Sequence, residues 1–126
     1  MTIRRILVVG AGAMGSGIAQ TAAVSGCEVT MMDVIPAALE KGLATIQKSV
    51  AKLHEKGKLT DGQKAAAARI VTAGDYEPAR AADIVIEAAT ENPELKLSIF
   101  RELDALARPD VILASNTSSI SLTKIG

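Results

Sequence analysis

The sequence predicts an α/β domain in which helices cover a doubly wound parallel sheet. Three observations support this fold class: short apolar runs alternate with amphipathic segments, a glycine-rich turn follows the first run, and aromatic residues are nearly absent. Hydrophobic residues make up 48% of the 126-residue chain and aromatic residues only 2%. We therefore expect one domain over residues 1–126, with a core of Val, Ile, Leu, Ala and Met.

The first strand is predicted over Arg5–Val9 and the first helix over Met14–Ser25, with Gly26 as its C-cap. Between them lies the glycine-rich sequence GAGAMGSG, residues 10–17. Such a turn brings free backbone N–H groups and the positive end of the helix dipole to one place, which suits a pyrophosphate. The chain is therefore expected to bind a dinucleotide on a Rossmann-type fold.

Three glycines of this turn have separate physical roles. Gly10 allows a tight turn out of the strand, Gly12 lets the backbone approach the pyrophosphate, and Gly15 lets the helix pack closely on the sheet. The predicted cofactor contacts of the turn are Gly10, Ala11, Gly12, Ala13, Met14 and Gly15. A motif of this kind is informative only in its context, which here is a strand before it and a helix after it.

Asp33 directly follows the second predicted strand, Glu28–Met32, about 21 residues after Gly12 of the glycine turn. An acidic residue in this place accepts hydrogen bonds from the adenosine ribose, and its charge repels the additional phosphate of NADP. The alternative is that Asp33 only begins the next turn, since Asp is common after strands. Spacing and position together favour the cofactor role, with NAD as the cofactor.

A helical hairpin is predicted between the second and third strands. Pro36–Lys56 forms a long amphipathic helix that Gly57 ends, and Thr60–Gln63 is a capping box for a short helix that runs to Arg69. The third strand is Ile70–Thr72. A simple mononucleotide-binding half needs only one helix here, so we interpret the hairpin as a candidate substrate surface. The apolar positions of the long helix are Leu39, Leu43, Ile46, Val50 and Leu53.

The rest of the chain continues the alternation. The fourth strand is predicted over Ala82–Ala89, and Asn92 caps a helix over Pro93–Ala107. The fifth strand is Val111–Ala114, which leads into the polar loop Ser115–Ser119. The expected strand order is 3-2-1-4-5. The inner face of the last helix is predicted to consist of Leu95, Ile99, Leu103 and Leu106.

Polar residues follow several of these strands. Ligands of open parallel sheets bind outside the carboxyl ends of the strands, so residues that follow different strands belong to one predicted site. They are the glycine turn, Asp33, Glu91, Asn116 and Ser118. The alternative is that Glu91 is an ordinary charge before a helix and that the Ser-rich loop caps the next one.

Four stretches, taken in order, resemble one known family. They are GAGAMGSGIA from Gly10, Asp33, VIEAATEN from Val85 with Lys96 downstream, and SNTSS from Ser115. Together they resemble the amino-terminal domain of the 3-hydroxyacyl-CoA dehydrogenases, and most of all the bacterial 3-hydroxybutyryl-CoA dehydrogenases. The resemblance covers essentially the whole chain. It implies reversible hydride transfer between the 3-hydroxyl carbon of an acyl-CoA and NAD.

The resemblance also implies roles for single residues at the reacting end of the cofactor. Glu91 and Lys96 approach the nicotinamide-side ribose, while Asn116 and Ser118 lie beside the nicotinamide and the substrate oxygen as catalytic residues. The Ser118 hydroxyl can donate to that oxygen, and the Asn116 amide offers a donor and an acceptor. Lys96 opposes the dipole of its helix at a cost of about a few tenths of a kcal/mol, which a ligand contact offsets. No metal is expected.

The CoA moiety has its own implied contacts. Ser49 and Lys56, on the long helix, match family positions that touch CoA, and Ser118 contacts the substrate as well. Their alternative interpretation is an ordinary solvated helix face. The resemblance therefore implies that the helical hairpin binds the acyl-CoA.

The family's general base is a histidine beyond the SNTSS loop, paired with a glutamate, and neither lies before Gly126. His54, the sole histidine, is expected to be exposed on a basic helix. We therefore expect a fragment of a longer two-domain enzyme, inactive by itself, whose full-length form is a homodimer. The alternatives are a standalone NAD(H)-binding module and another NAD-linked 3-hydroxyacid dehydrogenase.

Charge and cysteine content favour a cytoplasmic protein. The formal net charge is zero, from 14 basic and 14 acidic residues, so no surface for nucleic acid or membrane is predicted. No apolar run is long enough to cross a bilayer. Cys27, the single cysteine, cannot form an internal disulfide and is expected to be a buried thiol.

Overall fold

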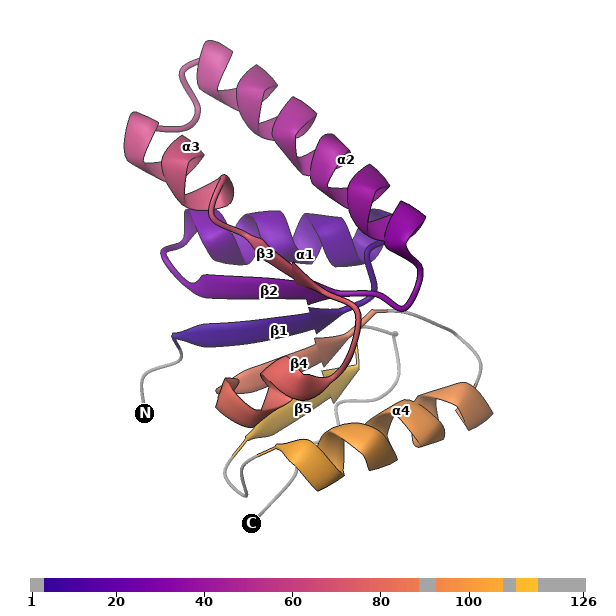
Figure 1. Ribbon diagram of the computed structural model, residues 1–126. Coiled ribbons are helices and arrows are strands. Elements are labelled where there is room, and N and C mark those ends of the chain that lie inside the picture. The colour runs from indigo at the N-terminus through magenta and orange to yellow at the C-terminus, as the bar shows by residue number, and fades with distance from the viewer. Residues whose placement is uncertain (1–3, 89–92, 108–110, 116–126) are drawn as a thin grey trace.

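The computed structural model describes residues 4–88, 93–107 and 111–115, and these form a twisted parallel sheet flanked by helices (Figure 1). The strand order is β3-β2-β1-β4-β5, with every neighbouring pair parallel, as the sequence predicts. The strands are β1 (Arg5–Val9), β2 (Glu28–Met32), β3 (Val71–Ala73), β4 (Ile84–Glu87) and β5 (Ile112–Ser115).

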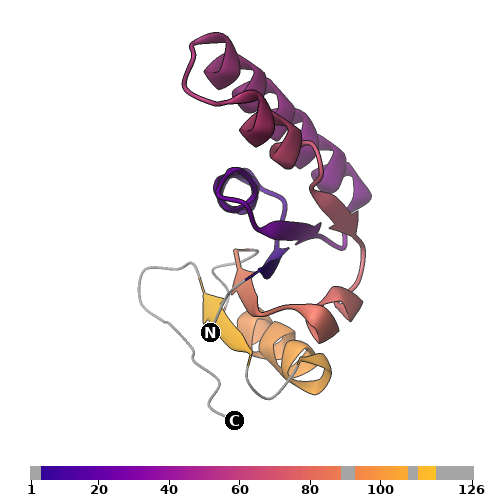
Figure 2. The ribbon, with the colours of Figure 1, turned by 90° about the vertical axis from the view of Figure 1, so that its left-hand side faces the viewer.

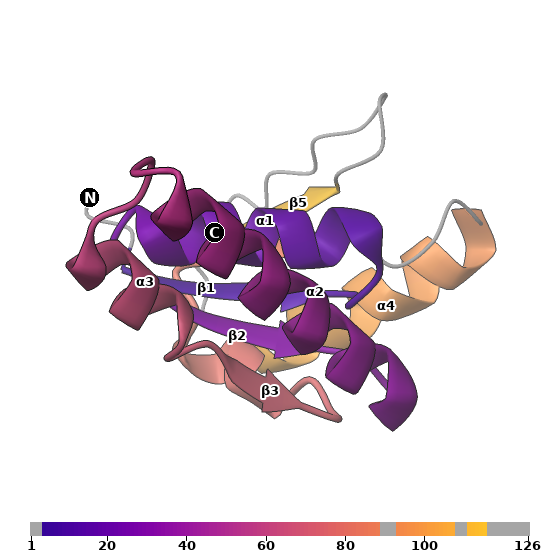
Figure 3. The same cartoon turned by 90° about the horizontal axis from the view of Figure 1, so that it is seen from above.

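Helices cover both faces of the sheet. The helices α1, α2 and α3 lie over one face, and α4 lies over the other with the short 3₁₀ helix η1 (Figures 2 and 3). The bounds are α1 (Ala13–Val24), α2 (Pro36–Glu55), α3 (Asp61–Ala67), η1 (Glu77–Ala81) and α4 (Pro93–Leu106). None of these helices is both long and apolar enough to cross a membrane.

The side chains of β1 point alternately to the two faces of the sheet, and each face has its own core cluster. Leu7 and Val9 point into a cluster under α4 and η1, whereas Val8 points into a cluster under α1, α2 and α3. All three side chains are buried, as expected for a central strand of a parallel sheet. Val9 pairs with Met32 on one side and Glu87 on the other, so the three central strands end level with one another.

The helical hairpin forms as predicted and packs on α1. Gly57, with φ of 74°, lies between its two helices. The Thr60 hydroxyl accepts from the Gln63 N–H at 3.1 Å, and the Gln63 side chain accepts from the Thr60 N–H at 2.9 Å, which completes the predicted capping box. His54 Nε2 lies 2.6 Å from Asp61 Oδ1, so the histidine links the two helices.

Several predicted boundaries were wrong. The last three strands begin later than expected, and η1 was not predicted. The reason at β4 is Asp83, whose carboxylate accepts from the backbone N–H groups of Arg4 and Arg5, so the chain is still anchored to the start of β1 at that point. Cys27 is only half-buried rather than buried.

The predicted inner face of α4 was wrong at its first position. Leu95 is 50% exposed, whereas Lys96 is buried. The buried face therefore consists of Lys96, Ile99, Phe100 and Leu103. The helix is rotated so that a cation, rather than a leucine, meets the sheet at the first turn of α4.

Candidate functional site

The glycine turn sits at the carboxyl end of β1 and begins α1. Gly10 has φ of 113°, and its N–H donates to the Met32 carbonyl at 2.6 Å. Gly12 is the N-cap of α1, and no side chain caps that end. The first N–H groups of a helix have no partner inside the helix, so this end presents donors and the positive pole of the dipole.

The space around Gly15 and the space around Gly12 differ. A Cβ on Gly15 would lie 1.9 Å from the Gly10 carbonyl oxygen, so any other residue would force the helix away from the turn. A Cβ on Gly12 would meet nothing within 4 Å, so this part of the turn is open. An open backbone over a helix N-terminus fits the pyrophosphate of a dinucleotide.

Gly42 on α2 is a further glycine of this site, and sequence analysis missed it. A Cβ there would lie 2.7 Å from the Ala11 carbonyl oxygen. The long helix therefore packs directly against the glycine turn. The available signal was an isolated glycine within an amphipathic helix, which often marks a close contact.

Asp33 joins the glycine turn to the loop after β2. Its Oδ2 accepts from the Ala11 N–H at 3.0 Å, and its Oδ1 accepts from the Ile35 N–H at 2.9 Å. The residue thus begins the next turn and holds the glycine turn as well. A carboxylate has about four acceptor sites, so these two bonds leave capacity for ribose hydroxyls. Ala11 supports the site through its N–H rather than offering that group to a ligand.

Lys96 reaches the sheet from the first turn of α4. Its Nζ lies 3.2 Å from Oε1 of Glu87, and the two side chains are 11% and 0% exposed. Glu87 is the last residue of β4, so this ion pair belongs to the same edge of the sheet as the glycine turn. The sequence alone indicates a role for Lys96 and none for Glu87.

Tyr76 lies under the same edge and was also missed. It packs against the core cluster of Leu7, Val9 and α4. Burial raises the pKa of its phenol, and the nearby carboxylates of Glu102, Asp33 and Glu87 raise it further. The phenol is therefore neutral at physiological pH.

The candidate CoA residues lie on the hairpin. The Ser49 hydroxyl accepts from the Gln20 amide of α1 at 3.0 Å, a contact that sequence analysis did not predict. Lys56 is exposed at the C-cap of α2, two helical turns beyond Ser49. Glu91, Asn116 and Ser118, together with the cap residue Asn92, lie outside the described residues.

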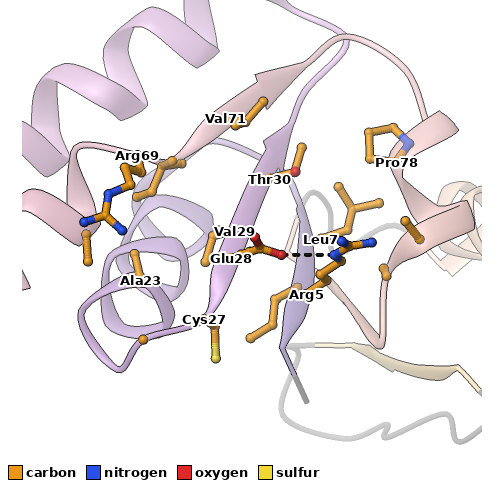
Figure 4. A pocket seen from close by; sticks show the side chains of 16 residues that line it. Arg5, Leu7, Ala23, Cys27, Glu28, Val29, Thr30, Arg69, Val71 and Pro78 are labelled. Atoms are coloured by element: carbon orange, nitrogen blue, oxygen red, sulfur yellow. Dashed lines mark hydrogen bonds and ion pairs between the residues drawn. The ribbon is translucent and has the colours of Figure 1, made fainter. Parts of the chain in front are cut away.

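A groove at the opposite end of the sheet is separate from this site. It has a volume of about 520 Å³ and lies among the amino ends of β1, β2 and β3 (Figure 4). An ion pair from Arg5 Nε to Glu28 Oε2, 3.0 Å long, bridges its wall. Within residues 4–88, 93–107 and 111–115, no cluster of His, Cys, Asp and Glu is arranged to hold a metal ion.

Comparison with known proteins agrees with this geometry. Residues 5–126 match the family model described as 3-hydroxyacyl-CoA dehydrogenase, NAD binding domain. The chain is 50% identical over 126 residues to a probable 3-hydroxybutyryl-CoA dehydrogenase of Bacillus subtilis, covering 99% of this chain and 44% of that protein. A second probable 3-hydroxybutyryl-CoA dehydrogenase, from Deinococcus radiodurans, is 46% identical over 94% of this chain and 42% of its own length.

A solved structure shows the same fold. The crystal structure of the (S)-3-hydroxybutyryl-CoA dehydrogenase of Ralstonia eutropha superposes with a TM-score of 0.88 at 51% identity, over 98% of this chain and 44% of that one. The chain thus spans less than half the length of these relatives. NAD is the cofactor that this domain type binds. The chain belongs to the 3-hydroxyacyl-CoA dehydrogenase family and comprises its NAD-binding domain.

Proposed function

We propose that this chain is the cofactor-binding part of an enzyme that reversibly oxidises the 3-hydroxyl group of a short acyl-CoA such as 3-hydroxybutyryl-CoA. The observation that carries the proposal is the contact of Asp33 with the glycine turn at 3.0 Å. The Asp33 carboxylate holds the glycine turn, whose N–H groups donate to the pyrophosphate, and the same carboxylate accepts from the ribose. The names of the relatives support the choice of substrate.

The cofactor extends along the carboxyl edge of the sheet in this proposal. The N–H groups at the start of α1 donate to the pyrophosphate, and Asp33 accepts from the adenosine ribose. Glu91 and Lys96 bind the nicotinamide-side ribose. NAD, when bound, supplies the hydride acceptor. Two parts of the sheet edge therefore bind opposite ends of the cofactor.

The substrate occupies the hairpin side of the site and the loop after β5. Ser118 donates to the substrate oxygen and Asn116 orients it, while Ser49 and the Lys56 ammonium bind the CoA moiety. His54 is not assigned as the base, since Asp61 engages it at 2.6 Å within the hairpin. The base belongs to the part of the relatives that this chain does not span. We further infer that the whole enzyme is a cytoplasmic homodimer.

Calorimetric titration of the chain with NADH, and separately with NADPH, tests the cofactor assignment. We expect NADH to bind and NADPH to bind at least about tenfold more weakly, because the Asp33 carboxylate repels the additional phosphate. Asp33→Asn removes the charge, and it also removes one of the two backbone bonds that Asp33 accepts. The lost backbone bond affects both cofactors alike, so the loss of charge should bring the two affinities together. Equal binding of both cofactors to the unmodified chain would contradict the proposal.

Turnover tests the assignment of the missing base. With acetoacetyl-CoA and NADH we expect the isolated chain to give no oxidation of NADH above background, although it binds the cofactor. Rapid turnover by this chain, lost again in His54→Gln, would show that the base had been assigned wrongly.

A further inference from the structure

The ion pair between Glu87 and Lys96 is buried at the carboxyl edge of the sheet. The Glu87 side chain is 0% exposed, and the Lys96 side chain is 11% exposed. Both placements are electrostatically unfavourable alone, because burial removes water from a carboxylate and a cation in the first turn of a helix opposes the dipole. Each charge is accommodated by the other.

Stability alone is a weak reason for such a pair. Replacing a buried ion pair by apolar residues of similar volume is often neutral or stabilising, because the pair must first lose its water. The core around it is apolar, with Val85, Ile99 and Leu103 all buried. An apolar pair would fit this surrounding, so the charges point to a role besides packing.

The position of Glu87 indicates what that role is. Glu87 pairs in register with Val9, the residue directly before Gly10, and the next N–H, of Ala88, donates to the Val9 carbonyl at 2.8 Å. The carboxylate is therefore fixed by the sheet beside the strand that carries the glycine turn. A lysine side chain is flexible by itself, and the 3.2 Å contact to this fixed carboxylate limits where its ammonium can lie.

We propose that Glu87 is a positioning residue, whose buried carboxylate holds the Lys96 ammonium at the sheet edge to donate to the nicotinamide-side ribose of the cofactor. The inference rests on the proposed function, which places Lys96 at that ribose. An ammonium has three N–H donors, so it can bond a carboxylate oxygen and a ribose hydroxyl together. Glu87 acts through Lys96 and does not touch the cofactor.

Fragments of the cofactor separate positioning from a general structural effect. ADP contains the adenosine and the pyrophosphate, ADP-ribose adds the second ribose, and NADH adds the nicotinamide. For Glu87→Gln we expect the dissociation constants of NADH and ADP-ribose to rise by about tenfold, the value of one charge-assisted hydrogen bond, while that of ADP stays unchanged. The matched control is Glu28→Gln, which removes a carboxylate from the ion pair at the opposite end of the sheet and should leave all three values unchanged.

A double variant tests whether the effect of Glu87 on NADH affinity acts through Lys96. In Glu87→Gln combined with Lys96→Met, no charge is left unpaired, and we expect the same NADH affinity as in Glu87→Gln alone, because a lysine that is no longer held contributes nothing. A further large loss in the double variant would overturn the inference, since Lys96 would then reach the ribose without Glu87.

The other outcomes of these titrations distinguish failure of the inference from failure of the proposed function. Equal weakening of ADP, ADP-ribose and NADH in Glu87→Gln, or no weakening at all, would overturn the positioning role while leaving the proposed function in place. Failure of the unmodified chain to bind any of the three would overturn the proposed function and the inference together.

Discussion

The two ends of the parallel sheet offer different things to a ligand. The amino end has a groove of about 520 Å³ and an exposed ion pair between Arg5 and Glu28. The carboxyl end has the N-terminus of α1, the Asp33 carboxylate and the buried pair of Glu87 and Lys96. A hollow alone therefore does not locate a site. Oriented donors and fixed charges indicate one, and these gather at the carboxyl end.

The ion pairs at the two ends of the sheet should contribute differently to the free energy of unfolding. Lys96→Met leaves the Glu87 carboxylate buried without its cation, which should lower the free energy of unfolding by about 3 kcal/mol. Arg5→Met, the matched change at the amino end, leaves an exposed carboxylate and should cost less than about 1 kcal/mol. Urea denaturation measures both. Similar values for the two variants would show that the ends of the sheet do not differ in this way.

The glycines of the turn give the second comparison. Gly15→Ala places a Cβ 1.9 Å from the Gly10 carbonyl oxygen and should lower the free energy of unfolding by roughly 2 kcal/mol, with loss of NADH binding. Gly17→Ala meets nothing within 4 Å and should raise the free energy of unfolding by about 0.5 kcal/mol, since Ala is the better helix former. Thermal unfolding that shifted equally in both would contradict the close approach of helix and turn.

The hydrogen bond between Gln20 and Ser49 extends the comparison to the hairpin. Gln20→Met removes the donor and should cost about 1 kcal/mol of stability, with a reduction of about threefold in affinity for CoA if Ser49 contacts it. Gln47→Met, an exposed position on α2, is the control and should change neither quantity. Calorimetry with CoA measures the affinity. An unchanged affinity in Gln20→Met would remove the argument for a positioned Ser49.

Tyr76 gives the smallest expected effect, and it depends on pH. Its folded pKa lies above the ordinary value of 10.0, because burial and nearby carboxylates disfavour the phenolate. Well below pH 10 the phenol is neutral in both the folded and the unfolded chain, so the full free energy of unfolding is retained. As the pH rises further the unfolded phenol ionises first, and the free energy of unfolding falls. Tyr76→Phe should show a shallower fall in stability above pH 10 by urea denaturation.

Local signals in the sequence were sufficient for the glycine turn and the capping box, whereas the strand order was expected from the fold class that these signals indicate. Each depends on residues close together in the chain, such as the apolar run before Gly10 or the capping box at Thr60. Asp33 was predicted from its distance to the turn, and the structure adds the contact that joins the two. The glycine turn and the capping box could be predicted because neighbouring residues determine them.

Other features could not be predicted because packing between distant segments determines them. The contact of Gly42 with Ala11 joins α2 to the glycine turn, and the bond from Gln20 to Ser49 joins α1 to α2. The rotation of α4 that buries Lys96 instead of Leu95 follows from the carboxylate at the end of β4. In each case neither partner alone carries a signal that identifies the other.

Hydrogen exchange of the chain with and without NADH tests most directly the claim that the cofactor binds at the carboxyl end of the sheet. We predict that NADH slows exchange in residues 10–17 and 33–35, where the glycine turn and Asp33 lie, and leaves residues 27–30 and 69–71 of the amino-end groove unchanged. Slowed exchange confined to the groove, with the glycine turn unchanged, would contradict the account.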